Sequence, residues 1–154
     1  DHTFSVIIYN AGIFLKDFFG SLEKNSLLKQ FETNSLSPLL LSEKLRQNFE
    51  KDSKLVFISS RMGSITDNSS GGSYGYRMSK VSLNMAAACL HHELKPKGVN
   101  VLCLHPGYVK TRMTGGRGHL EVSESVKLML SQVKNYQAKE SFNFLHASGE
   151  VLEW

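Results

Sequence analysis

Cysteine is scarce in this sequence, and its two cysteines do not form a metal-binding pattern. Cys89 and Cys103 each stand inside an apolar segment. Small buried side chains in a reducing compartment explain this placement better than a disulfide or a metal pair does. The six histidines form no HExxH motif and no Cys/His set, and the adjacent His91 and His92 cannot share one face of a helix. We therefore expect no metal site.

Long apolar runs and clustered basic residues are also missing. No apolar run reaches the roughly 18–20 residues that span a bilayer, and the chain starts directly with a strand-like run rather than a charged leader. The net charge is +4, but the lysines and arginines are scattered, whereas a nucleic-acid-binding protein gathers them on one element. We expect a cytoplasmic protein that binds neither membranes nor nucleic acid.

The composition that remains is that of an ordinary globular domain. Hydrophobic residues make up 41% of the chain and charged residues 21%, as is usual for globular proteins. A chain of 154 residues can bury a real core. No repeat or linker divides it, so we expect residues 1–154 to form a single domain.

Short apolar runs alternate with helical patterns along the chain. This alternation predicts an α/β fold, in which parallel βαβ units form a sheet covered by helices. Glycines and polar residues between 61 and 73 predict a loop, and residues 149–154 read as a tail. The predicted strands are 4–9, 54–60, 99–104 and 142–146, and the predicted helices are 22–49, 74–94 and 122–135.

The stretch 22–49 is long, rich in leucine and interrupted. Pro38 lacks a backbone donor, so we expect a kink or a break between Asn34 and Pro38. Seven apolar residues suit a stripe that faces the core. They are Leu27, Leu28, Phe31, Leu39, Leu41, Leu45 and Phe49.

Helical spacing selects one of two tyrosines near the start of the predicted helix 74–94. Tyr76 and Lys80 are four residues apart and share a face, whereas Tyr74 lies about 240° around the axis from Lys80. A free phenol has a pKa of about 10, and a neighbouring cation lowers it. Tyr76 is therefore a candidate acid–base group with Lys80 as its cation, and a plain surface pair is the alternative.

The predicted strands end in polar or glycine-bearing groups, and ligands of parallel sheets collect at such carboxyl ends. Four motifs in chain order resemble those of the short-chain dehydrogenase/reductase family, and the sixteen-residue gap from Ser60 to Tyr76 resembles its sniffer-type carbonyl reductase branch. The likeness covers essentially the whole chain. The motifs are Asn10-Ala11-Gly12, Asn34, Ser60 with Tyr76-x-x-x-Lys80, and Pro106-Gly107-x-Val109-x-Thr111.

The resemblance implies an NAD(P)-dependent oxidoreductase that transfers hydride reversibly between nicotinamide and a carbonyl or alcohol. It gives Tyr76 the role of general acid and Lys80 that of a ligand of the nicotinamide ribose. Ser60 would hydrogen-bond the substrate oxygen, and Ser59 would face the other way because consecutive strand residues alternate. Asn34, through its kinked backbone, would hold a water molecule that joins Lys80 to a proton relay.

The same resemblance implies a cofactor site, a substrate pocket and an oligomer. NADP is favoured over NAD, and the substrate would be a small carbonyl or alcohol. The loop 113–120 and the segment 142–154 would line the pocket, where Met113, Phe144 and Trp154 favour a hydrophobic carbonyl compound. A homodimer or homotetramer is expected, with Ala86, Ala87 and Ala88 letting helices approach closely. The cofactor-binding residues would be Asn10, Ala11, Gly12, Tyr76, Lys80, Pro106, Gly107, Val109 and Thr111.

The resemblance is incomplete at the amino-terminal end. The family opens with a glycine-rich loop that binds the pyrophosphate at a helix N-terminus, and this sequence has no match to it. We therefore expect the C-terminal portion of a Rossmann-type domain, with about four strands and with strand 4–9 as an open apolar edge.

Two alternative functions follow from the same residues. One is a catalytically silent remnant that acts only by association through the open edge. The other is an epimerase-type relative, which would share the Tyr-x-x-x-Lys pair, but the Pro106–Thr111 motif and the short tail count against it.

Overall fold

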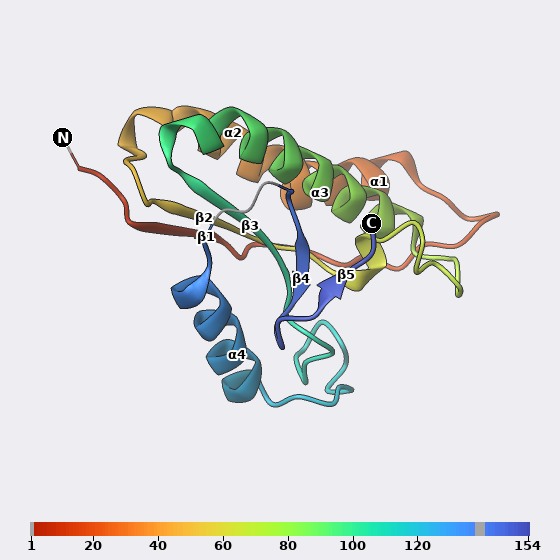
Figure 1. Ribbon diagram of the computed structural model, residues 1–154. Coiled ribbons are helices and arrows are strands. Elements are labelled where there is room, and N and C mark those ends of the chain that lie inside the picture. The colour runs from red at the N-terminus through yellow and green to blue at the C-terminus, as the bar shows by residue number, and fades with distance from the viewer. Residues whose placement is uncertain (1, 138–140) are drawn as a thin grey trace.

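Five strands form one mixed sheet in the computed structural model, which describes residues 2–137 and 141–154. The strands are β1 (Val6–Tyr9), β2 (Lys54–Ile58), β3 (Asn100–His105), β4 (Phe144–His146) and β5 (Val151–Leu152). They lie side by side in that order, the first four parallel and β5 antiparallel to β4 (Figure 1). The predicted α/β fold with a parallel sheet is confirmed.

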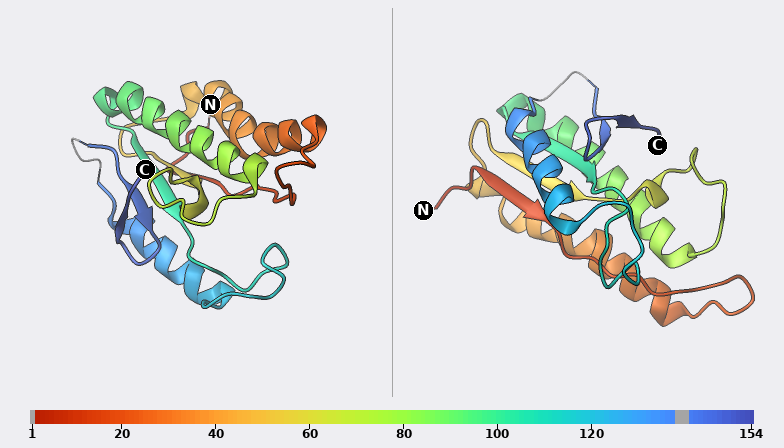
Figure 2. Two further views of the ribbon diagram at one scale, coloured as in Figure 1. Left: turned by 90° about the vertical axis from the view of Figure 1, so that its right-hand side faces the viewer. Right: turned by 90° about the horizontal axis from the view of Figure 1, so that it is seen from below.

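Helices cover both faces of this sheet. On one face lie α1 (Lys24–Phe31), α2 (Ser37–Lys44) and α3 (Tyr74–Leu94), and on the other lies α4 (Val122–Asn135), as Figures 1 and 2 show. Short 3₁₀ turns at Arg46–Asn48, Arg61–Gly63 and Lys95–Lys97 connect the main elements. The predicted bounds of α3 and α4 agree with the structure, and Pro96 and Gly98 mark the end of α3.

The central strands carry a core on each side. Leu55 and Phe57 of β2 belong to the core beneath α3, together with Val101 and Cys103 of β3. The residues between them, such as Val56, belong to a second core beneath α4. Because alternate residues of a strand face opposite sides, a strand buried on both faces is apolar throughout.

A π-helical turn, Glu32–Leu36, interrupts the helical stretch between α1 and α2. The expected interruption is therefore present, but as an extra-wide turn and not as a break. Pro38 stands in the first turn of α2, where a missing backbone donor costs little. Such π-turns often mark functional sites, and Asn34 is buried in this one.

The apolar stripe predicted for this stretch is wrong in part. Leu28, Phe31 and Leu41 are 52%, 40% and 45% exposed. The helical segments bury polar side chains in their place, including Gln30 and Asn34. The many leucines predict a helix here, but they do not predict which face is buried. That face is set by the hydrogen bonds that its polar side chains make with other parts of the chain.

Other expectations also need correction. Residues 151–152 form strand β5, so the end of the chain is not a simple tail. Cys89 is exposed on α3, whereas Cys103 is buried as expected, and both thiols are free. Ala87 is fully buried in the core, so it cannot belong to a surface patch of small residues. Phe144 is likewise fully buried and does not line a pocket.

The sheet ends at β1, which pairs with β2 alone. Ile8 pairs with Val56 and so faces the α4 side of the sheet, as Val6 does, but α4 leaves both uncovered, at 46% and 42% exposed. Ile7 packs against the core beneath α3. Within the described residues, β1 thus presents an unpaired apolar edge, as predicted. Across those same residues, the structure contains no helix with the length and hydropathy needed to cross a bilayer.

Candidate active site

The carboxyl ends of β1, β2 and β3 meet at one edge of the sheet. Tyr9, Phe57 and Cys103 stand in register across these three strands. The polar groups that follow them in the sequence therefore emerge at the same level. Helix α3 begins near this edge, so its first turns can face those groups (Figure 2).

Tyr76 and Lys80 lie on the buried face of α3. They are 8% and 4% exposed, and the Lys80 Nζ lies 5.7 Å from the centroid of the Tyr76 ring. Lys80 Nζ also donates a hydrogen bond of 2.8 Å to the carbonyl of Ile58 at the end of β2. The lysine therefore joins α3 to the carboxyl edge, and the alternative of a solvated surface pair is wrong.

Ser60 and Ser59 point to different neighbours. The Ser60 hydroxyl lies near the Tyr76 phenol and lowers its pKa, and it accepts the Met62 N–H at 3.2 Å. Ser59 Oγ donates to Asn84 Oδ1 at 2.6 Å, deeper beneath α3. Of the two serines, Ser60 thus stands beside the phenol.

Asn34 binds two other parts of the site through its side chain. Its Oδ1 accepts the Ile13 N–H at 2.8 Å, and its Nδ2 donates to the Ile13 carbonyl at 2.9 Å. The same Nδ2 donates to Ser79 Oγ at 2.9 Å, and that hydroxyl donates to the Tyr76 carbonyl at 2.7 Å. Asn34 therefore holds both the segment after β1 and the turn of α3 that carries Tyr76.

Two glycines lie beside these side chains, and one of them is required by the packing. A Cβ on Gly12 would lie 3.5 Å from Asn34 Oδ1 and 3.7 Å from Lys80 Nζ, so the segment after β1 passes directly beside both side chains. A Cβ on Gly63 would stand 2.9 Å from Lys80 Cβ and 3.0 Å from the Lys80 carbonyl carbon. Gly63 therefore permits the close approach of α3, while Asn10 and Ala11 are exposed at the rim.

The motif after β3 forms a separate loop at the same edge. Gly107 takes a φ of 86°, and a Cβ there would strike Leu120 at 2.7 Å, so glycine is required. The Pro106 carbonyl accepts Ser125 Oγ of α4 at 2.7 Å. The Val109 carbonyl accepts a hydrogen bond from Thr114 Oγ1 at 2.8 Å, and Thr114 Oγ1 accepts the Thr111 N–H at 3.0 Å. These hydrogen bonds fold the loop upon itself and fasten it to α4.

Burial dominates the ionisation of the site. It raises the pKa of Tyr76 above its ordinary value, and the nearby Ser60 hydroxyl opposes this only in part. Burial also lowers the pKa of Lys80 to about 8. The expected lowering of the Tyr76 pKa by Lys80 is therefore not found, because the lysine donates to a carbonyl and the phenol is desolvated.

His105 ends β3 but is a poor candidate for acid–base work. Its pKa is lowered to about 3, first by burial and then by neighbouring His146 and Arg61. The imidazole is therefore neutral at physiological pH and cannot supply a proton. Tyr76 remains the candidate acid–base group of this edge.

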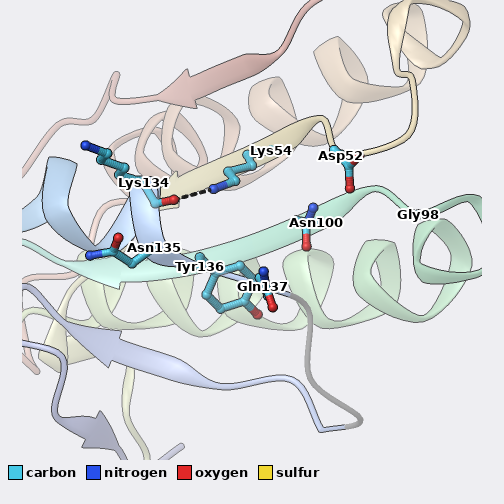
Figure 3. A pocket seen from close by; sticks show the side chains of 8 residues that line it. All are labelled: Asp52, Lys54, Gly98, Asn100, Lys134, Asn135, Tyr136 and Gln137. Atoms are coloured by element: carbon cyan, nitrogen blue, oxygen red, sulfur yellow. Dashed lines mark hydrogen bonds between the residues drawn. The ribbon is translucent and has the colours of Figure 1, made fainter.

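Two hollows lie away from these residues. One of about 590 Å³ opens at the amino ends of β2 and β3, where the Lys54 ammonium donates to the Lys134 carbonyl (Figure 3). The other, of about 510 Å³, lies between the loop 61–73 and the outer side of α3, with Tyr74 and Met78 in its wall. Neither is lined by Tyr76, Lys80, Ser60 or Asn34. No group of three or more His, Cys, Asp or Glu side chains suited to a metal occurs in the described part of the chain.

Several supporting residues were not predicted from the sequence. Asp17 is 4% exposed and Gln30 is fully buried, and Phe14 lies edge-on to the Tyr76 ring at 5.1 Å between centroids. Gln30 precedes Asn34 by four residues and so shares its face, a signal that points to it once Asn34 is a candidate. Asp17 and Phe14 stand in an irregular segment, where no periodic pattern identifies buried residues.

A parallel sheet with helices on both faces, and with its polar groups at the carboxyl edge, is part of a Rossmann-type fold. The family model for short chain dehydrogenases matches residues 2–121. The chain therefore belongs to the short-chain dehydrogenase/reductase family of oxidoreductases, as its motifs indicate.

Two curated relatives align over almost the whole chain. The 1-hydroxy-2-glutathionyl-2-methyl-3-butene dehydrogenase of a Rhodococcus species is 35% identical over 152 residues, covering 96% of this chain and 67% of that protein. The C-signal protein of Myxococcus xanthus is 33% identical over 152 residues, covering 97% of this chain and 92% of that protein. A family member of nearly this length is thus known.

Solved structures give the same result. The carbonyl reductase Sniffer of D. melanogaster superimposes with a TM-score of 0.89 at 29% identity, covering 97% of this chain and 66% of that one. The NADPH-bound carbonyl reductase from chicken fatty liver gives 0.88 at 33% identity, covering 99% and 67%. The chain spans about two thirds of the length of these structures, and its likeness to sniffer-type carbonyl reductases is confirmed.

Proposed function

We propose that the chain carries the proton-transfer half of an NAD(P)-dependent oxidoreductase that interconverts a carbonyl and an alcohol. The observation that carries this proposal is the buried group of Tyr76, Lys80 and Ser60 at the carboxyl edge of the sheet. A buried phenol, a buried ammonium and a hydroxyl at one edge are costly to bury without use. Strongly perturbed groups of this kind cluster at active sites.

Tyr76 acts as the general acid in the direction of carbonyl reduction. Because burial raises its pKa, the phenol is protonated at neutral pH and has a proton to give to a carbonyl oxygen. Ser60 hydrogen-bonds the same oxygen and also the phenol. In its charged form Lys80 stabilises the phenolate left behind, which is an anion formed only during the reaction.

The residues present suit the nicotinamide half of a dinucleotide. Lys80 Nζ spends one donor on Ile58 and has further donors for ribose hydroxyls. Gly12 approaches Lys80 closely, and Gly107 adopts a turn that only glycine takes without strain. Asn10, Ala11, Pro106, Val109 and Thr111 would line the rest. When bound, the nicotinamide supplies the hydride; relatives bind NADPH or NADP, so NADP is the proposed cofactor.

The proposed substrate is a small carbonyl or alcohol compound, as for the carbonyl reductases that this chain resembles. Met113 is 47% and Trp154 41% exposed, so each can still contribute to an apolar wall. Trp154 stacks on Phe142 and Phe144. Phe144 then acts as support beneath the wall rather than as part of it.

The proposed place of this chain in the enzyme is the C-terminal portion of one Rossmann-type domain. Its open β1 edge is where further parallel strands would pair. A dinucleotide bound by these residues alone loses its pyrophosphate contacts. We therefore expect weak binding, with no measurable heat on calorimetric titration with NADPH at micromolar concentrations.

A chimera tests the function directly. The part of the chicken carbonyl reductase that this chain does not cover is joined ahead of residue 2, and NADPH oxidation is followed with small carbonyl compounds. Turnover by the chimera, and its loss with Tyr76→Phe while NADPH still binds, are the expected results. A folded chimera that binds NADPH but reduces none of the carbonyls would exclude the proposed function.

Association without catalysis is a second candidate, favoured by two observations. The C-signal relative has nearly the length of this chain, and β1 offers an unpaired edge with Val6 and Ile8 exposed. Met78 and Met85 on the outer face of α3 are 60% and 64% exposed, which suits a homodimer or homotetramer. A concentration-dependent oligomer in sedimentation, with a chimera that has no turnover, would favour this function. No described residue favours the epimerase alternative.

A further inference from the structure

The segment that follows β1 runs along the helical stretch and is held there by side-chain amides. Asn34 pairs with both backbone groups of Ile13, at 2.8 and 2.9 Å. Gln30 Oε1 accepts the Leu15 N–H at 2.9 Å. Gln30 Nε2 then donates to Asp17 Oδ2 at 3.3 Å. Alternate residues 13, 15 and 17 are thus bound in order by a single helix face.

The spacing of the two elements explains this arrangement. Two residues of an extended chain advance by about 6.6 Å, and four residues of a helix advance by about 6 Å. Side chains at positions 30 and 34 therefore keep pace with backbone groups at positions 15 and 13. The amides take the place of a neighbouring strand and satisfy backbone groups that would otherwise be buried without partners.

Asp17 continues the row onto α3. Its Oδ2 accepts the Gly75 N–H at 3.0 Å, one of the orphan donors in the first turn of that helix. The N-cap residue, Ser73, makes no side-chain cap of its own, so a residue distant in sequence caps the helix. A Cβ on Gly75 would lie 2.4 Å from Gln30 Nε2 and 3.0 Å from Asp17 Oδ2, so only glycine fits.

The consequence falls on the next residue, Tyr76. Its carbonyl accepts Ser79 Oγ, which Asn34 in turn donates to. Its ring meets that of Phe14, which lies in the chain between the two bound residues Ile13 and Leu15. The same row of amides therefore fixes the backbone before Tyr76, the backbone at Tyr76 and the ring beside it.

We propose that Asp17 and Gln30, acting with Asn34 as an amide clamp, are positioning residues that set the place of the Tyr76 phenol. This proposal rests on the proposed function in one respect: Tyr76 is taken to be the group that transfers a proton. Asp17 Oδ1 is buried without a hydrogen-bond partner in the described residues, so this carboxylate is costly to bury. The position that it imposes on α3 is the benefit that offsets that cost.

Two single variants and one double variant test the clamp. Asp17→Leu removes the oxygen, Oδ2, that accepts from both Gly75 and Gln30, and Gln30→Glu turns a carboxylate toward the carboxylate of Asp17. The double variant combines Gln30→Glu with Asp17→Asn, so that an amide faces the new carboxylate and the repulsion between positions 17 and 30 is removed. The whole chain is compared by NMR, without cofactor, with Glu32→Gln as an exposed control on the same helical stretch.

Two signals are read for each variant. Each single variant should accelerate amide hydrogen exchange at Gly75 at least about tenfold relative to Val101 of β3, the effect of losing one hydrogen bond to a charged group. Each should also weaken the nuclear Overhauser contact between the Phe14 and Tyr76 rings. The double variant should bring both signals back toward those of the original protein when compared with Gln30→Glu alone, because the repulsion between two carboxylates is removed.

The outcomes separate clearly. Single variants that leave both signals unchanged would overturn the clamp, and so would a double variant no better than the singles. Single variants that unfold while the double variant folds would support it. In the chimera, the singles should lower kcat and leave the KM for NADPH unchanged, with rescue in the double. A chimera without any turnover would contradict the proposed function but not the clamp, because the clamp is tested separately by the NMR signals.

Discussion

The inner and outer faces of the helical layer invert the usual distribution of side chains. The inner face near the site buries Gln30, Asn34 and Lys80, while the outer face exposes Leu28 and Met85. Buried polar groups persist only where each finds a partner, and exposed apolar patches commonly mark interaction surfaces. The contrast agrees with the function proposed for the inner face and makes the outer face a candidate surface for contact with a second chain.

The largest expected effect is on the inner face, at Tyr76. In the chimera with turnover, Tyr76→Phe should lower kcat by about 10²–10⁴, the usual contribution of a general acid, and leave NADPH affinity within about twofold. Steady-state kinetics and calorimetry would check this. Simultaneous loss of turnover and of NADPH binding would show that the hydroxyl is structural, and the contrast between faces would lose its functional meaning.

The next effect concerns the partners of Asn34. Replacing Asn34 by Leu leaves the Ile13 N–H and carbonyl buried without partners, at a cost of about 1–3 kcal/mol for each unsatisfied group. Urea unfolding should therefore show a loss of several kcal/mol. Glu32→Leu, at an exposed position of the same π-turn, is the matched control and should change stability by under about 0.5 kcal/mol.

Lys80 predicts a pH dependence of stability. Its pKa is about 8 in the folded state against 10.5 for the free group, so the unfolded state holds more protons between these values. The free energy of unfolding should therefore rise with pH from about 8 to 10.5, by at most about 3 kcal/mol. Lys80→Met should remove this rise when unfolding is compared at several pH values; an unchanged slope would refute the assignment.

The smallest effect on folding is expected at the outer edge. Ile8→Lys on β1 places a charge at a position that is already 46% exposed, so stability should change by under about 0.5 kcal/mol. Self-association should nevertheless weaken, because charges on edge strands oppose pairing. Sedimentation at several concentrations would measure this. An oligomer insensitive to Ile8→Lys but abolished by Met85→Lys would place the contact on α3.

How much of the fold can be predicted from the sequence depends on whether the pattern that carries the information is local. The strands and the bounds of α3 and α4 could be predicted, because hydrophobic periodicity and Gly or Pro stop signals are local. Strand β5 is two residues long and pairs only with β4, so it has no pattern of its own. The prediction of which face of the stretch 22–49 is buried failed. Leucines outnumber the few polar residues that turn inward, so the hydrophobic pattern pointed to the wrong face.

The order of motifs and the spacing of Tyr76 and Lys80 were settled by the sequence alone, since a helix fixes the angle between residues four apart. Tertiary structure decided two other points. Burial outweighs the neighbouring cation in setting the pKa of Tyr76, and Asp17 caps a helix 58 residues away. Desolvation and long-range hydrogen bonds depend on what surrounds a group in space, and no local pattern along the chain contains that information.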